Sequence, residues 1–525
     1  MRLMDKISNR IYHMGLGAVQ LLTLLLMAAL TLCSFFWGYY AEDMDSQVSV
    51  SHTEPLLFHL AGLALLLLLL FLLLKGSRRH TARFRRFLLG IALCWVCFWG
   101  LFLIIYGRSI PSADSASVYT IAEALASGQL GVIHPTDSYL SYYPQQIGLA
   151  AFYEIVIRLW NLLPFPYAAY YVLQLLNVGM ACMIVYCQYQ ITVLLSHGSD
   201  QAAIAYLFLA MLNAPLLVYT SFVYGEIPSF AFLSGGLFLL LSCLMGQPLT
   251  PRRRYLYLAF SLLLLILSVA LRKNSLIVII AVVLTALWEW LKQHKHTLLL
   301  YAVLLMIGSL TILPSIQHIY EYRAGNTLSS GVPAISYVAM GMQESSRGNG
   351  WYNGFNFSTY EDSYLDMEIA SQASKEAIQT SLAAFGADPR YALRFYKEKF
   401  LSQWTDGTYF CRQATLQSHG RSPIMEQLYT GSLSLPFNHY CDIYQLLIYG
   451  SALACLLQQW RRRKQTSAAG LPFYTGMIAV LGGFLFHMVW EANSRYILPY
   501  FLLMLPYAAL ELGTLYTALS RKQIG

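Results

Sequence analysis

The sequence predicts an all-α polytopic membrane protein with about twelve transmembrane helices, in a range of roughly 11–13. The chain has 525 residues, 57% hydrophobic and only 11% charged, whereas soluble domains are about 25% charged. Apolar stretches of about 20 residues, enough to cross about 30 Å of hydrocarbon, recur along the chain. Only helices satisfy the backbone hydrogen bonds of such spans. This composition excludes a disordered protein, a nucleic-acid binder and an ordinary cytosolic enzyme.

Each apolar stretch is read as one span. We expect spans near 15–37, 56–74, 87–107, 166–190, 203–222, 227–245, 255–271, 274–291, 298–317, 441–459, 471–490 and 496–517. The first follows three basic residues as a signal peptide would. It has no convincing small-residue cleavage site and is long enough to cross, so we interpret it as retained.

The basic residues set the orientation. With both termini in the cytoplasm, 20 of the 34 Lys and Arg residues lie on cytoplasmic segments, as the positive-inside rule requires. These segments are the N-terminus, 75–86, 252–254, 292–296, 461–464 and 521–522. The net charge of +8 therefore reflects topology and does not by itself indicate an anionic partner.

The remaining segments divide the chain into four parts. We expect N-terminal helices over 1–86, a core over 87–317 with a first outer loop at 108–145, an extracytoplasmic segment over 318–440, and C-terminal helices over 441–525. The stretch 143–163 breaks the alternation of crossings, so it is expected in the interface or as a re-entrant piece. Its Glu154 and Arg158 are spaced to pair on one helix face.

The cysteines give little evidence of metal or disulfide chemistry. Seven of the nine lie in spans, where they serve as small apolar residues. Cys411 and Cys441 are expected on the outer side, where a disulfide is permitted, and the sequence leaves that bridge open. No Cys and His arrangement has zinc spacing. We therefore assign no metal ligand and no cofactor, and a divalent metal, although compatible with the chemistry, lacks support from ligand spacing.

A basic pair interrupts one apolar run. Arg272 and Lys273 stand in LRKNSLI, between two cytoplasmic loops, so their turn lies at the outer face. Cations at the membrane centre are costly, at about 2.5–3.5 kcal/mol each. They either snorkel to the interface or bind an anion, and a basic pair placed against the positive-inside bias favours a phosphate.

Two further outer turns carry charge. Glu226 begins a helix in YGEIPSF, where a carboxylate also simply complements the helix dipole. Glu491, Arg495 and Tyr496 lie between the last two spans, where Glu491 and Arg495 could equally close a helical hairpin as a salt bridge.

The first outer loop supplies a third carboxylate and an aromatic segment. Asp114 lies just beyond the membrane surface, where a lone aspartate is otherwise only solvated or a helix cap. Tyr143 and Gln146, in YYPQQIGL, suit a sugar ring but also an interfacial aromatic belt. Together, carboxylates and cations from separate segments lie at one face. Cations stabilise a phosphate leaving group, and a carboxylate accepts the proton of an acceptor hydroxyl.

These motifs resemble the GT-C superfamily of membrane glycosyltransferases, and more closely its bacterial protein O-mannosyltransferase-like and aminoarabinose-transferase-like branch. The resemblance rests on the span layout, the acidic first outer loop, YYPQQIGL, YGEIPSF, LRKNSLI and EANSRYILPY. It implies an inverting transfer from a polyprenyl-phosphate-linked sugar at the outer face of the cell membrane, to an envelope glycan, lipid or protein acceptor. Membrane lipid is a further expected partner, and nucleic acid is not.

The resemblance also implies residue roles. Asp114 matches the catalytic acidic residue, and Glu226 matches a second one that binds the acceptor or orients the base. Arg272 and Lys273 match the phosphate-binding tip, which Arg495 assists. The sequence departs from many relatives in having Asp-Ser where they carry two adjacent acids, and in two extra N-terminal spans.

Two other functions remain open on the sequence. A transporter or flippase of lipid-linked sugars also needs cations and aromatic residues, although it would place them near mid-membrane and show repeats. A glycan polymerase or ligase with a pyrophosphate-linked donor uses similar groups. The absence of an internal repeat and the position of the charges favour the transferase.

Overall fold

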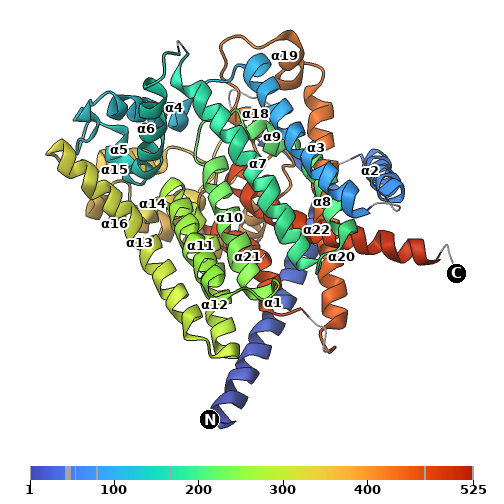
Figure 1. The fold of residues 1–525 in the computed structure, drawn as a ribbon. Coiled ribbons are helices and arrows are strands. Elements are labelled where there is room, and N and C mark those ends of the chain that lie inside the picture. The colour runs from blue at the N-terminus through green and yellow to red at the C-terminus, as the bar shows by residue number, and fades with distance from the viewer. Residues whose placement is uncertain are drawn as a thin grey trace.

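A computed structural model describes residues 2–41, 49–53, 55–77, 81–165, 167–465 and 469–522. Within these ranges the chain is almost entirely helical, and the long helices pack into one bundle (Figure 1). Eleven helices in the described ranges are long and apolar enough to cross a membrane. The predicted fold class, an all-α multi-pass membrane protein, is therefore confirmed.

The membrane-spanning helices account for all but one of the predicted spans. They are α1 (Arg2–Phe36), α2 (Leu56–Gly76), α3 (Thr81–Phe102), α7 (Ala169–Leu195), α10 (Glu226–Met245), α11 (Pro251–Leu271), α12 (Leu276–Gln293), α13 (His296–Ala324), α20 (Ser434–Arg462), α21 (Thr475–Val489) and α22 (Leu498–Lys522). Short 3₁₀ or π turns extend four of them, namely η2 (Leu103–Gly107), η5 (Lys273–Ser275), η6 (Leu471–Tyr474) and η7 (Ser494–Ile497).

The span expected at 203–222 is divided into α8 (Asp200–Leu212) and α9 (Ala214–Tyr219). The break follows from Asn213, whose side chain caps α9, and from Pro215 in its first turn. Asp200 pairs with Arg85 of the basic segment 75–86 at 2.6 Å. The start of α8 therefore lies at the end of the bundle where α3 begins.

The connections form a second layer at the opposite end of the bundle. They contain α4 (Ala113–Ala126), η3 (Leu130–Val132), α5 (Tyr139–Tyr142), η4 (Pro144–Gln146), α6 (Ile147–Asn161), α14 (Ala334–Gly341), α15 (Phe355–Asp362), α16 (Met367–Ala387), α17 (Pro389–Trp404), α18 (Cys411–Ala414) and α19 (Pro423–Tyr429). Figure 1 shows α4, α5 and α6 gathered with α15 and α16 at one corner.

The stretch 143–163 that disturbed the predicted alternation contains the short helix α6, which is absent from the candidate spans. The expected pair forms, with Arg158 Nε 2.8 Å from Glu154 Oε1. Arg323 at the end of α13 also pairs with Glu154 at 3.1 Å, and the Tyr320 hydroxyl donates to the same carboxylate. These contacts of Glu154 link α6 to α13.

A two-stranded antiparallel hairpin joins α1 to α2. Strands β1 (Trp37–Ala41) and β2 (Ser49–Thr53) pair with Trp37 opposite Thr53. The amide of Tyr39 donates to the carbonyl of Thr405 at 3.2 Å, and the Lys397 ammonium lies 4.9 Å from the Trp37 ring centroid. The hairpin therefore packs on the end of α17.

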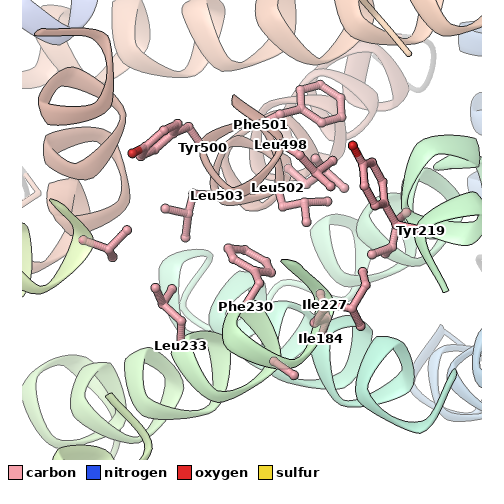
Figure 2. Packing of buried hydrophobic residues seen from close by; sticks show 14 of the residues in the cluster. Ile184, Tyr219, Ile227, Phe230, Leu233, Leu498, Tyr500, Phe501, Leu502 and Leu503 are labelled. Atoms are coloured by element: carbon pink, nitrogen blue, oxygen red, sulfur yellow. The ribbon is translucent and has the colours of Figure 1, made fainter. Parts of the chain in front are cut away.

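Side chains of α10 and α22 face one another across the apolar core of the bundle (Figure 2). Phe230 and Leu233 of α10 face Leu502 and Leu503 of α22, and all four side chains are buried. α10 itself packs closely on α7 and α11, and α22 on α8 and α20. Close packing of this kind holds membrane helices together, because lipid offers no hydrophobic driving force between them.

All nine cysteines are described and are free thiols. Cys411 and Cys441, between which the sequence left a bridge open, are both buried and are not joined. Cys441 lies within α20 and not in a loop.

Candidate functional site

Three turns meet at one end of the bundle. Glu226 begins α10, Arg272 follows α11 in extended backbone (φ −154°, ψ 112°), and Arg495 lies in η7 before α22. Gly225 makes this meeting sterically feasible, because a Cβ there would lie 2.8 Å from the carbonyl oxygen of Leu271. The end of α11 therefore packs directly on the turn that precedes α10.

The three charged side chains form a buried ion cluster. Arg272 Nη1 lies 2.9 Å and Arg495 Nε 3.4 Å from Glu226 Oε1. The Glu226 side chain is 2% exposed and each arginine side chain 15%. Neither oxygen of the Glu226 carboxylate has a hydrogen-bond partner, so both guanidiniums are held by charge. Arg495 forms its ion pair with Glu226, so the alternative of a Glu491–Arg495 bridge is wrong.

Aromatic rings enclose the two guanidiniums. The Arg272 guanidinium carbon is 5.3 Å from the Tyr224 centroid and 5.7 Å from that of Tyr496. The Arg495 guanidinium carbon is 5.5 Å from both of these rings and 5.9 Å from Phe222. Cation–π contacts of this kind stabilise a cation without neutralising it.

Gln146 of the YYPQQIGL motif and Tyr153 of α6 both form hydrogen bonds with Tyr224, one of the rings around this cluster. Gln146 Nε2 donates to the Tyr224 hydroxyl at 2.5 Å, and the Tyr153 hydroxyl donates to the Tyr224 carbonyl at 3.0 Å. The Tyr143 ring lies 4.9 Å from Tyr139. Gln146 therefore joins the predicted site directly, whereas Tyr143 lies in an adjacent group of tyrosines.

Asp114 lies in the first turn of α4 and is exposed. A capping box between Ser112 and Ser115 starts this helix, and Ala113 adopts a left-handed φ of 46°. Burial raises the pKa of Tyr139, as do the nearby Tyr224 and the Asp114 carboxylate to which its hydroxyl is hydrogen-bonded. Asp114 is thus the exposed carboxylate beside the buried ion cluster.

A second carboxyl group, Glu491, lies near Asp114 in the turn between α21 and η7. Burial raises the pKa of Glu491 to about 7, Arg495 acts against this, and Asp114 adds to it. The Tyr496 hydroxyl donates to Glu491 Oε2 at 3.4 Å. The structure therefore brings together eight of the nine predicted residues, and the ninth, Lys273, is exposed beside Arg272 without a contact to the ion cluster.

Two loops of the long segment 318–440 contact the turn that carries Glu491. The amide of Ala492 donates to the carbonyl of Gly350 at 2.7 Å, and the Ser494 hydroxyl donates to Asp406 Oδ2 at 2.6 Å. Buried Lys399 donates to the carbonyl of Trp490 at 2.8 Å, and burial lowers the pKa of Lys399 to about 7. No feature of the sequence had indicated a role for Lys399.

The sequence also missed Tyr224 and Arg347. Tyr224 stands two residues before Glu226, so its position next to a candidate carboxylate was the available signal. Arg347 lies within electrostatic range of Glu491 and 5.4 Å from the Tyr352 centroid. No feature of the sequence around Arg347 distinguishes it from an ordinary surface arginine.

The chemistry of this site is that of an anion-binding group beside a carboxylate pair. Two arginines share one carboxylate, which leaves an excess positive charge in a partly desolvated cluster. Guanidinium groups match phosphate oxygens in geometry. Asp114 and Glu491 supply exposed and buried carboxyl groups at its edge.

Comparison with known proteins gives similar folds only. No model of a known protein family matches the sequence, and no curated protein matches it. Solved structures with a similar arrangement include the Archaeoglobus fulgidus oligosaccharyltransferase in the apo form (TM-score 0.47, 11% identity, 84% of this chain and 51% of that chain). Another is the oligosaccharyltransferase AglB of that organism with an inhibitory peptide and a dolichol-phosphate (TM-score 0.44, 13% identity, 85% of this chain and 52% of that chain). This chain spans about half the length of these proteins, and its function has to be argued from its own site.

Proposed function

We propose that this protein is a GT-C-type glycosyltransferase that moves a sugar from a polyprenyl-phosphate donor to an envelope glycan, lipid or protein, with inversion at the anomeric carbon. One observation carries the proposal. Residues from four separate segments place two guanidiniums, an exposed carboxylate and a buried carboxyl group around one position at the end of the bundle. A reaction that separates a sugar from a phosphate needs this combination.

Arg272 and Arg495 bind the donor phosphate. Their shared partner Glu226 neutralises one of two positive charges, so the cluster retains attraction for an anion. Because the guanidiniums do not form directed hydrogen bonds with Glu226, a phosphate gains those bonds without breaking any. The exposed Lys273 adds charge at the rim.

Asp114 is the proposed general base. The acceptor hydroxyl attacks the anomeric carbon, its proton passes to the Asp114 carboxylate, and the carbon–oxygen bond to phosphate breaks. The bonding electrons leave with the phosphate, whose growing negative charge the two arginines stabilise. A single displacement of this kind inverts the anomeric centre.

Glu226 is a positioning residue in this mechanism. Its side chain is 2% exposed and holds both guanidiniums, so it orients the phosphate-binding groups and does not meet the acceptor. Gln146 fixes Tyr224 against the same guanidiniums. Tyr143, Glu491 and Tyr496 border the space between Asp114 and the cluster, where a sugar would lie.

The distribution of basic residues supports an outer location for the site. Arg85 and Asp200 meet at the end of the bundle that carries the first cytoplasmic basic segment, and the ion cluster lies at the other end. Both termini are then cytoplasmic in the cell membrane, and the reaction takes place on the outer face.

Replacement of Asp114 tests the proposal. Asp114→Asn keeps the size of the side chain but removes the base, so we expect transfer to fall by at least about 100-fold. Membranes that contain the variant are incubated with a radiolabelled polyprenyl-phosphate hexose, and the label that is transferred from the polyprenyl phosphate to any other molecule is measured. Asp137→Asn, in the same loop and 88% exposed, is the matched control and should keep full activity.

Full activity of the folded Asp114→Asn protein would overturn the assignment of the base. The transporter reading predicts a different result, namely movement of the labelled lipid across vesicles with no new glycosidic bond. That result in the wild-type protein would overturn the proposed transfer itself.

A further inference from the structure

A group of metal-ligating side chains lies away from the proposed active site. Among the described residues, His52, His439 and Asp442 each offer one ligand atom, and these three atoms lie within 4.8 Å of one another. His52 belongs to strand β2, whereas His439 and Asp442 are in the first turns of α20. Chain segments far apart in the sequence therefore converge on one point.

We propose that His52, His439 and Asp442 bind a divalent transition metal that fastens the hairpin between α1 and α2 to the start of α20. Two imidazoles and a carboxylate are donors that suit Zn²⁺ and its neighbours. Zinc binds imidazole nitrogen at about 2.0–2.1 Å, so the three side chains move closer together when they bind the ion.

The side chains around the group limit its orientation. Asp442 Oδ1 accepts from the amide of Gly407 at 3.1 Å, which fixes the carboxylate as supporting bonds do in known metal sites. The His52 ring packs 4.3 Å from Tyr40 and 6.1 Å from His439. The buried ring of His59 lies 6.3 Å from the ring of His439, so it also limits the space around the group.

The position of the group gives the metal a structural role. Gly407 follows Asp406, which accepts from Thr408 and from Ser494 beside Arg495. Metal binding at Asp442 therefore supports the segment 406–408, which contacts the turn that leads to Arg495, and it joins the hairpin to the start of α20. This role does not depend on the proposed transfer reaction.

Metal content and thermal stability test the site. The full chain is purified in detergent, stripped with EDTA, incubated with ZnCl₂ and desalted, and zinc is measured by mass spectrometry alongside the melting temperature. We expect about one zinc per chain, a higher melting temperature with zinc, and at least about tenfold weaker zinc binding in His439→Gln and Asp442→Asn.

Asp442→Asn retains an acceptor oxygen for Gly407, so it separates metal binding from the hydrogen bond. His318→Gln, at an exposed position on α13, is the matched control and should bind zinc as the wild type does. The zinc titration of wild-type protein needs no variant to fold. Absence of zinc and of a melting shift in the wild type would overturn the proposal, as would unchanged zinc binding in both ligand variants.

Discussion

Glu226 shows at the scale of one residue how a buried charge is tolerated at a membrane protein's site. Its carboxylate lies between Arg272 and Arg495, and neither guanidinium has another carboxylate at ion-pair distance in the described structure. Removal of the central charge leaves two desolvated cations side by side. Such a change costs about 3–5 kcal/mol, more than any exposed ion pair contributes.

Glu226→Gln should therefore lower the free energy of unfolding by about 3 kcal/mol and weaken donor binding as the guanidiniums lose their orientation. Reversible unfolding in mixed micelles measures the first effect, and binding of undecaprenyl phosphate measures the second. Glu123→Gln, at an exposed position of α4, should change neither. Equal stability of the two variants would show that Glu226 does not hold the cluster.

Glu491 connects the site to pH. Burial raises its pKa to about 7 from an ordinary value of 4.5, so between these pH values the folded protein binds a proton that the unfolded chain releases. Stability due to this group is greatest at low pH and is lost as the pH rises through 7. Above pH 7 the Glu491 carboxylate is charged. Its burial and its repulsion by the nearby Asp114 both oppose folding.

Glu491→Gln should remove this pH dependence. At pH 5 the variant and the wild type carry the same charge and should melt at similar temperatures, whereas at pH 8 the variant should melt several degrees higher. Melting curves at four pH values, with Glu376→Gln on α16 as an exposed control, measure the difference. A constant offset between variant and wild type over this range would contradict the assigned titration.

At the scale of elements, the turn at 490–494 is held by close backbone approach. A Cβ on Gly341, near the end of α14, would lie 2.6 Å from the carbonyl carbon and oxygen of Trp490. Gly341 is thus required because α14 touches the backbone of the turn that carries Glu491. Lys399 bridges the same two elements through the carbonyls of Gly341 and Trp490.

Gly341→Ala should separate α14 from this turn, lower the melting temperature and reduce transfer at least tenfold through the displaced Glu491. Gly386→Ala in α16 is the matched control, because a Cβ there meets no atom within 4 Å. Gly386 is exposed in the last turn of α16, so this control should leave the melting temperature and the transfer activity unchanged. The transfer activity of both variants is measured. Full activity of Gly341→Ala would exclude a role for α14 in positioning the turn that carries Glu491.

Sequence patterns predicted individual elements better than their contacts. Length and hydropathy were sufficient for eleven spans, and i,i+4 spacing was sufficient for the pair between Glu154 and Arg158. They did not predict the break between α8 and α9, because an apolar run is the same whether or not Pro215 divides it. They also left the partner of Arg495 undecided, since the nearer carboxylate in sequence, Glu491, is not the one it meets.

At the scale of the whole molecule, topology placed most candidate residues at one end of the bundle before any contact was known. It could not show which of them touch, because the tertiary packing that brings the start of α10 to η7 decides that Glu226 meets Arg495. The proposed metal-binding group shows even more clearly that the sequence does not reveal such contacts. His52 and His439 have no spacing that a motif can describe, and they meet only because the hairpin folds back over α20.

The same topology makes a prediction about the whole chain. If α8 and α9 together form a crossing, the turn before α8 lies on the cytoplasmic side with Arg85, and the first outer loop lies on the other. Single cysteines are introduced at Thr136, His197 and Gln465 after the exposed Cys94 and Cys97 are replaced by serine. A membrane-impermeant maleimide applied to intact cells should label Thr136→Cys at once, and His197→Cys and Gln465→Cys only after permeabilisation. Labelling of His197→Cys in intact cells would mean that α7 does not cross the membrane. A crossing by α8 and α9 would then put Glu226 on the inner face, separate it from Asp114 and exclude the proposed mechanism.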